Sequence, residues 1–182
     1  LDWIGRYIEC SLQEKHGLSI RIGGNIQEVR NQIIHFINRY VYLNGTFRKL
    51  HPSNYCFLNW FHGDPHSPDP GSQRVFSALL ESIPYTQKII VSCQITKQSL
   101  LDLGISEHKL VTIPLGVELV KFSPPTPGER SAIRAKLGIP EHAFCIGSFQ
   151  KDGEGRGEGN EPKLRKGPDV FLDVIRNLSA QH

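Results

Sequence analysis

Closely spaced cysteines are missing from this sequence. The 182 residues include only four cysteines, which are far apart at positions 10, 56, 93 and 145. They form no C-x-x-C pair, so the sequence indicates neither a zinc site of the usual spacing nor a thioredoxin-like redox motif. We expect all four to be reduced thiols of the core, and we expect no metal and no other cofactor.

Long apolar runs and a strong charge of one sign are also missing. No stretch approaches the roughly 18 apolar residues that cross a bilayer, because polar residues interrupt even residues 33–43. Charged residues at positions 2, 6, 9 and 14 do not suit a secretory signal. We therefore expect a cytoplasmic protein that could still contact a membrane peripherally. The net charge of +3 is too small to indicate a nucleic-acid surface, so we expect no nucleic-acid partner.

Apolar runs alternate with helical patterns along residues 1–122. The patterns predict strands at residues 18–22, 33–43, 55–61, 88–92 and 109–114. Helices are predicted at residues 2–14 and after residue 92, the second one ending at Gly104. Such alternation favours an α/β fold with a parallel sheet, whose ligands bind beyond the carboxyl ends of the strands. His62 and Gly116 fall at such ends.

A proline-rich connector follows at residues 123–128. Within it, Thr126 and Glu129 have the spacing of a capping box, and Pro127 suits the first position of a helix. We expect a helix that runs to Leu137 and stops at Gly138. Residues 123–142 are thus predicted to be a linker with one helix.

Residues 143–169 carry the clearest binding signal. An apolar run at 143–146 predicts a strand that ends at Gly147, a glycine-rich loop follows at 153–159, and an amphipathic helix is predicted from Gly167 and Pro168. The loop brings basic residues to the start of this helix, where free N–H groups and the macrodipole favour an anion such as a diphosphate. These residues are Lys151, Lys163, Arg165 and Lys166. The alternative is that they are ordinary solvated lysines and arginines.

Three segments of the chain together resemble a known enzyme family. They are residues 59–65 (Asn-Trp-Phe-His-Gly-Asp-Pro), residues 113–119 (Ile-Pro-Leu-Gly-Val-Glu-Leu) with the Phe-Ser-Pro at 122–124, and residues 146–169 with their Lys-Gly-Pro-Asp helix start. In this order they resemble the retaining glycosyltransferases of family 4. Those enzymes have the B-type glycosyltransferase fold, in which a first Rossmann-like domain binds mainly the acceptor and a second binds mainly the nucleotide-sugar donor.

The resemblance implies a domain plan. Residues 1–122 would be most of an acceptor-side Rossmann-like domain, and residues 143–182 would be the beginning of a donor-binding domain. One strand and one helix bury too little apolar surface to be stable alone. We therefore expect the second Rossmann-like domain to be incomplete in this chain, and the fragment to be inactive by itself.

The resemblance also implies a reaction. A sugar would move from a nucleotide-diphosphate-sugar donor to a saccharide or other hydroxyl acceptor, with retention of the anomeric configuration. The diphosphate would be bound by Gly147, Ser148, Lys151 and Lys166, because lysines and a helix start can stabilise charge on a leaving phosphate without a metal. Ser148 stands where the family usually has an arginine, and Lys151 is the candidate for that charge. A non-catalytic sugar- or nucleotide-binding module is the alternative function.

The acceptor-side candidates follow the apolar run at residues 55–61. His62 matches the histidine that the family presents to the donor sugar, which it would bind or orient. Asp64 could orient His62, accept from a substrate hydroxyl or only shape a turn. Alternatively, His62 only packs within its loop, or it binds a metal together with Asp64 and His66, although no complementary ligands occur elsewhere. Gly63 and Gly116 are assigned to acceptor-side loops, where Gly116 permits either a close ligand or a tight turn.

Overall fold

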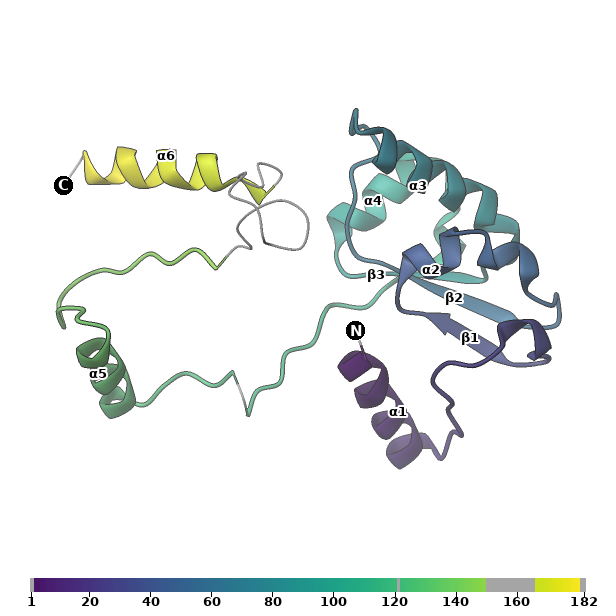
Figure 1. Cartoon of the computed structure of the whole chain (residues 1–182), viewed down its shortest axis with the longest axis horizontal. Coiled ribbons are helices and arrows are strands. Elements are labelled where there is room, and N and C mark those ends of the chain that lie inside the picture. Colours follow the sequence, from purple (N-terminus) through teal and green to yellow (C-terminus); the bar gives the residue numbers. More distant parts are fainter. Residues whose placement is uncertain (1, 121, 150–165, 181–182) are drawn as a thin grey trace. The chain divides into compact units, whose positions relative to one another are not determined.

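The computed structural model describes residues 2–120, 122–149 and 166–180, with side chains described from Gly5 onward. The chain forms two compact units, Leu1–Glu118 and Leu119–His182. Along the first unit, shown in Figure 1, lie α1 (Asp2–His16), β1 (Ile33–Phe36), α2 (Arg39–Leu43), β2 (Tyr55–Trp60), α3 (Pro70–Ser82), β3 (Lys88–Val91), α4 (Gln94–Asp102) and β4 (Leu110–Thr112). Short 3-10 helices at Ile26–Glu28, Thr46–Lys49, Ile83–Tyr85 and Glu107–Lys109 connect them.

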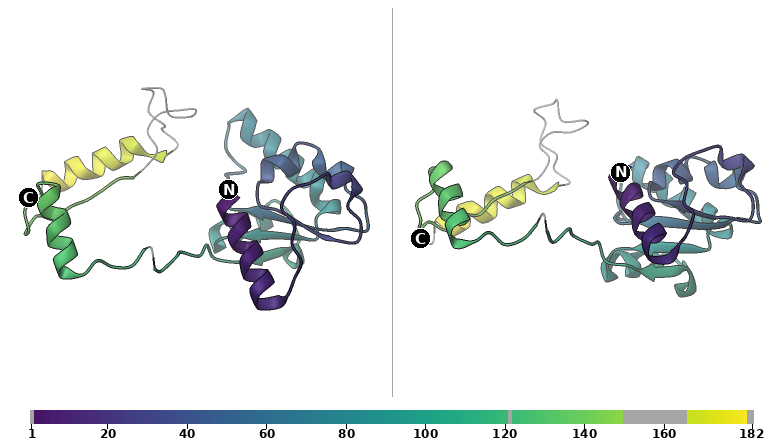
Figure 2. Two further views of the ribbon diagram at one scale, coloured as in Figure 1. Left: turned by 60° about the horizontal axis from the view of Figure 1, so that its bottom comes forward. Right: turned by 90° about the horizontal axis from the view of Figure 1, so that it is seen from below.

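The strands pair in parallel in the order in which they follow one another along the chain. Ile33 pairs with Tyr55, Leu58 with Ile89, and Ile89 with Leu110, which gives the order β1-β2-β3-β4. Crossovers between parallel strands are nearly always right-handed. Because every crossover here advances in the same direction, α2, α3 and α4 come to the same side of the sheet (Figures 1 and 2). The first unit is a Rossmann-like α/β fold, as the sequence predicts.

The two faces of this sheet differ in burial. On the face toward α2, α3 and α4, Leu58, Ile89 and Val91 are fully buried. On the other face, Ile33 and Tyr55 keep 67% and 61% of their surface exposed. Strands that are this apolar are typical of a sheet covered on both faces. In the described part of the unit, the helices that join the strands cover only one of the two faces of the sheet.

The core of the first unit lies between the sheet and these helices. Tyr42 and Phe47 are fully buried, and the ring of Tyr42 lies 4.7 Å from that of Phe36 and 5.6 Å from that of Phe47, measured between centroids. Nζ of Lys109 donates to the carbonyl groups of Ile83 (3.0 Å) and Thr86 and so supplies hydrogen-bond donors to the 3-10 helix before β3. Burial of each large apolar side chain stabilises the fold by about 2 kcal/mol.

The second unit contains α5 (Pro127–Lys136) and α6 (Pro168–Ser179) among its described residues. The predicted capping box is present, since Thr126 Oγ1 accepts from the backbone N–H of Glu129 while Glu129 Oε2 accepts from that of Thr126. Gly138 has a positive φ of 67° directly after this helix. No residue of either helix is buried. Their apolar side chains therefore have no closed core in the described part of this unit.

Three strand predictions need correction. Residues 18–22 and 143–146 form no strand, and residues 33–43 divide into β1 and α2. The division follows from Asn38, whose side chain accepts from the backbone N–H of Tyr40 at 3.0 Å and caps α2. A strand also needs a hydrogen-bonding neighbour, and neither of the two short runs finds one among the described residues.

The helix α3 is a further element, which was not predicted from the sequence. Its start has clear signals, because Asp69 caps it by accepting from the N–H of Ser72 (2.6 Å) and Pro70 occupies its first turn. The other predicted elements are confirmed, namely the helices that became α1, α4, α5 and α6 and the strands that became β2, β3 and β4. The predicted glycine-rich loop at 153–159 lies outside the described residues. Among the described helices, none has the length and apolar character to cross a membrane.

Candidate functional site

The loop after β2 is the best-defined candidate site. It begins at the carboxyl edge of the sheet, where ligands of parallel α/β folds bind, and it contains the predicted residues His62, Gly63 and Asp64. All three are exposed. Trp60, the last residue of β2, directly precedes the loop and is only 1% exposed.

Trp60 is enclosed by side chains from α2 and α3. The guanidinium carbon of Arg39 lies 4.4 Å from the centroid of the Trp60 ring, and the Phe76 ring lies 5.1 Å from it at an interplanar angle of 60°. A cation over an indole face is attracted by about 1 kcal/mol or more. Nη1 of Arg39 donates to the carbonyl group of His62, and Nη2 donates to the hydroxyl group of Tyr40 at 3.2 Å. Arg39 thus joins α2 to the candidate loop.

Gly63 has the backbone conformation and the space that only glycine tolerates. Its φ is 136°, and a Cβ atom added there would lie 3.1 Å from Cζ of Phe76 and 3.5 Å from Nη1 of Arg39. The peptide bond after His62 therefore lies close against both neighbours. Position 63 therefore requires glycine. From the sequence alone, it cannot be distinguished from a loop position at which glycine is only one of several possible residues.

Asp64 shapes the turn that follows. Its Oδ1 accepts from the backbone N–H of His66 at 2.8 Å. Its carbonyl group accepts from the N–H of Ser67 at 3.2 Å and from the hydroxyl group of Ser72 at 3.3 Å. Of the three roles considered for Asp64, these contacts support the turn. They also anchor the far end of the loop to α3.

Two other segments reach the same edge of the sheet. Cys93, before α4, is exposed, and its Sγ lies 3.3 Å from Oγ1 of Thr96. This hydrogen bond lowers the pKa of the Cys93 thiol. Gly116, after β4, is also exposed, and a Cβ atom there would meet nothing within 4 Å. The space beside Gly116 is open.

The cysteines are not all core residues, as the sequence suggested. Only Cys56 is buried, whereas Cys10, Cys93 and Cys145 are exposed. All four are free thiols, as predicted. Burial raises the pKa of Cys56 to about 11, since the thiolate would lose its hydration. No group of three or more possible metal ligands occurs among the described residues.

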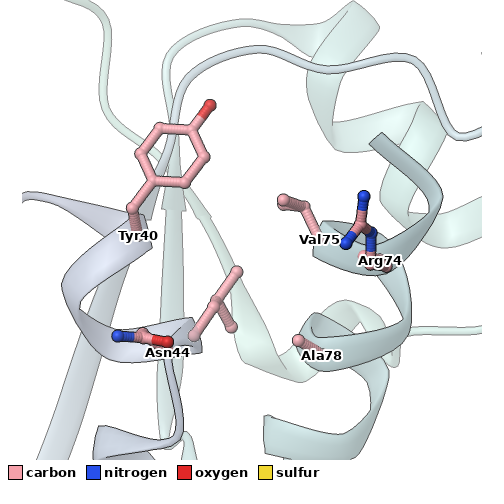
Figure 3. A pocket seen from close by; sticks show the side chains of 6 residues that line it. Tyr40, Asn44, Arg74, Val75 and Ala78 are labelled. Atoms are coloured by element: carbon pink, nitrogen blue, oxygen red, sulfur yellow. The ribbon is translucent and has the colours of Figure 1, made fainter. Parts of the chain in front are cut away.

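A pocket of about 360 Å³ lies between α2 and α3 (Figure 3). Leu43, Val75 and Ala78 supply its apolar lining, with Tyr40, Asn44 and Arg74 around them. Tyr40 also accepts from Arg39, which connects the pocket to the contact that holds His62. Its volume is at the lower end of the range of small-molecule sites. None of the residues predicted from the sequence lines it.

The predicted diphosphate-binding residues belong to the second unit. Lys166 is exposed and directly precedes Gly167, which caps α6 with a φ of 68°. Gly147 and Ser148 are exposed in an irregular segment rather than at the end of a strand. Lys151, Lys163 and Arg165 lie outside the described residues. Of this predicted site, Gly147, Ser148 and the helix start with Lys166 are therefore described.

His62, Gly63 and Asp64 lie on one loop, which is contacted by Arg39, and Arg39 in turn stacks on Trp60. Neither Arg39 nor Trp60 was predicted as a site residue. Arg39 was hidden because residues 33–43 were assigned to one strand, although Asn38 is a good helix cap and could have indicated that a new helix begins there. Comparison of the chain with protein-family models and with curated protein sequences gives no match.

Proposed function

We propose that this protein is a glycosyltransferase that moves a sugar from a nucleoside-diphosphate sugar to a hydroxyl acceptor with retention of configuration. The observation that carries the proposal is the position of His62, two residues after β2, at the carboxyl edge of a parallel Rossmann-like sheet, where ligands of such folds bind. A histidine whose loop is fixed by Arg39 and Phe76 suits the binding of sugar hydroxyl groups. The order of motifs along the sequence supports the same reaction.

In this proposal, the charged residues of the second unit stabilise the leaving group. Departure of a nucleoside diphosphate concentrates negative charge on its phosphate oxygens. A lysine at the start of a helix offers a positive charge beside free backbone N–H groups. Lys166 has this position before α6, and one preorganised donor of this kind commonly contributes about 3 kcal/mol to the transition state. Lys151, Gly147 and Ser148 complete the proposed phosphate-binding set.

On the acceptor side, His62 binds or orients the donor sugar. Asp64 keeps the loop in shape, Gly63 allows the loop to pack against Phe76, and Gly116 leaves open space at the sheet edge for substrate. The proposed reaction uses no metal and no cofactor. A cytoplasmic location is part of the same proposal.

The test is nucleoside-diphosphate release by a full-length version of the protein from a panel of nucleotide sugars, with each of several sugar acceptors present. Lys166→Ala is expected to lower turnover about a hundredfold, and His62→Ala is expected to weaken it at least tenfold. The matched controls are Lys136→Ala at the end of α5 and His66→Ala in the same loop as His62, both at exposed positions. Turnover that is unchanged in both site variants would remove these residues from the site. Donor binding without turnover would favour the non-catalytic sugar- or nucleotide-binding module.

A further inference from the structure

Arg39 has an unusual set of partners for a half-buried cation. Its guanidinium lies over the rings of Trp60 and Tyr40, 4.4 Å and 5.1 Å from their centroids, and donates to the carbonyl group of His62 and the hydroxyl group of Tyr40. Its Nε is buried without a hydrogen-bond partner, and none of the ion pairs among the described residues involves Arg39. Buried charges are normally paired with an opposite charge. A carbonyl oxygen and two aromatic faces take that place here.

We propose that Arg39 is a positioning residue that fixes His62 from the side of α2. The loop is already attached to α3 beyond His62, where Ser72 donates to the carbonyl group of Asp64 and Phe76 closes the space beside Gly63. His62 lies between this attachment and the end of β2. Arg39 reaches its carbonyl oxygen from the first turn of α2.

The backbone position controls where the His62 side chain can go. The rotamers open to a side chain depend on the φ and ψ angles of its own residue. Arg39 fixes the carbonyl group on one side of the His62–Gly63 peptide bond, and the positive φ of Gly63 fixes the chain on the other. Together they limit the directions in which the imidazole can point from the edge of the sheet.

The role needs the shape of arginine as well as its charge. A guanidinium is planar, stacks on an indole ring and donates from its outer nitrogens at the same time. Lysine carries the same charge on a single, strongly hydrated ammonium group. It can reach the carbonyl oxygen but cannot keep both the stacking on Trp60 and the second donor to Tyr40.

The test compares Arg39→Met and Arg39→Lys in the full chain by NMR. Arg48→Met is the matched control, because Arg48 also lies over an aromatic ring, that of Phe47 at 4.8 Å, but pairs with Glu81. Loss of the hydrogen bond is expected to shift the carbonyl ¹³C resonance of His62 and the amide ¹⁵N resonance of Gly63. Backbone order parameters at residues 62–64 are expected to fall below about 0.6, while those of β3 and β4 remain unchanged. Arg39→Lys is expected to fall between Arg39→Met and the wild type, because lysine can donate to the carbonyl oxygen but loses the stacking on Trp60 and the second donor to Tyr40. Arg48→Met is expected to resemble the wild type.

Two results would overturn the inference. One is an unchanged loop in Arg39→Met. The other is an equal change across the whole sheet, which would mean that Arg39 only stabilises the fold.

The consequence for substrate rests on the proposed function and has a separate measurement. The nucleotide sugars of the panel above, beginning with UDP-glucose, are titrated into the wild type, and one that binds is then titrated into His62→Ala, Arg39→Met and the double variant. Because Arg39 acts through His62, the two single variants are expected to weaken binding by a similar factor, and the double variant by no more than either. Additive losses would overturn the role of Arg39 in positioning His62. If the wild type does not respond to any nucleotide sugar, the proposed function fails, whereas the NMR shifts still decide what holds the loop.

Discussion

The hydroxyl groups of Tyr42 and Thr86 lie 2.8 Å apart in the core of the first unit and connect α2 to the turn before β3. Oγ1 of Thr86 donates its single proton to the carbonyl group of Ser82 at 2.9 Å. Tyr42 must therefore be the donor to Thr86. Burial raises the pKa of Tyr42 far above its ordinary value, so this donor keeps its proton at neutral pH.

Tyr42→Phe is expected to lower the free energy of unfolding by about 1–2 kcal/mol, because it removes one buried hydrogen bond and leaves Oγ1 of Thr86 without a donor. Urea denaturation at pH 7 measures the change. Tyr55→Phe is the control, since Tyr55 is 61% exposed. Equal midpoints for Tyr42→Phe and the wild type would contradict the assigned hydrogen bond.

Alkaline pH is expected to destabilise the first unit through Cys56. Burial raises the pKa of this thiol from 9.0 to about 11. The unfolded thiol therefore loses its proton at lower pH than the folded one, so stability is fully present below pH ~9 and falls as the pH rises towards ~11. A shift of this size corresponds to about 3 kcal/mol at most.

The measurement is the urea midpoint of wild type and Cys56→Ala between pH 7 and pH 11. The variant is less stable at pH 7 because of the lost packing, but its stability is expected to fall less steeply above pH 9. Tyr42 contributes a further loss near and above its ordinary pKa in both proteins. Parallel curves for the two proteins would argue against a raised pKa for Cys56.

Thr96 is expected to activate the thiol of Cys93. Its hydroxyl group is the main cause of the lowered pKa of Cys93. Thr96→Val keeps the shape of this buried side chain but removes the donor to the thiolate. Alkylation of Cys93 by iodoacetamide at pH 7.5 is expected to slow severalfold, with a pH profile moved to higher pH. Peptide mass spectrometry follows the reaction, and Ser99→Ala in the same helix is the control that should leave the rate unchanged.

Alanine is expected to have different effects at the two acceptor-side glycines. At Gly63 the positive φ and the ring of Phe76 at 3.1 Å oppose a Cβ atom, so Gly63→Ala is expected to cost about 1–3 kcal/mol. At Gly116 the added atom meets open space, and Gly116→Ala is expected to stay within about 0.5 kcal/mol of the wild type. Urea denaturation compares the two variants. Similar costs at both positions would mean that the loop after β2 is not held as described.

Local patterns in the sequence predicted those elements whose signals are also local. The strands that became β2 and β3 are continuous apolar runs, and α5 is marked by its capping box. The division of residues 33–43 was not predicted, because Ile, Phe, Tyr and Val favour a strand throughout. Only the helix cap at Asn38 indicates that a helix begins there. For residues 18–22 and 143–146, composition could not indicate whether a partner strand exists.

The same distinction applies to the candidate site. The loop with His62 could be predicted because it directly follows a clear strand. Its contact with Arg39 could not, since that contact joins segments 23 positions apart in the sequence. The use of Trp60 as a common base for Arg39 and Phe76 likewise depends on how α2 and α3 pack. Such contacts arise only from tertiary structure.

The strand order of the first unit also bears on how the protein folds. Each strand pairs with the strand before it in the sequence, so every strand pair forms between neighbouring segments of the chain. The loops to be closed are all about one helix and its connections long, and the entropy of closing a loop rises only slowly with its length. The sheet can therefore grow one strand at a time, with each new helix covering the strand pair just formed. Among parallel sheets, which are usually slow to form, this arrangement keeps the contact order low and favours rapid folding.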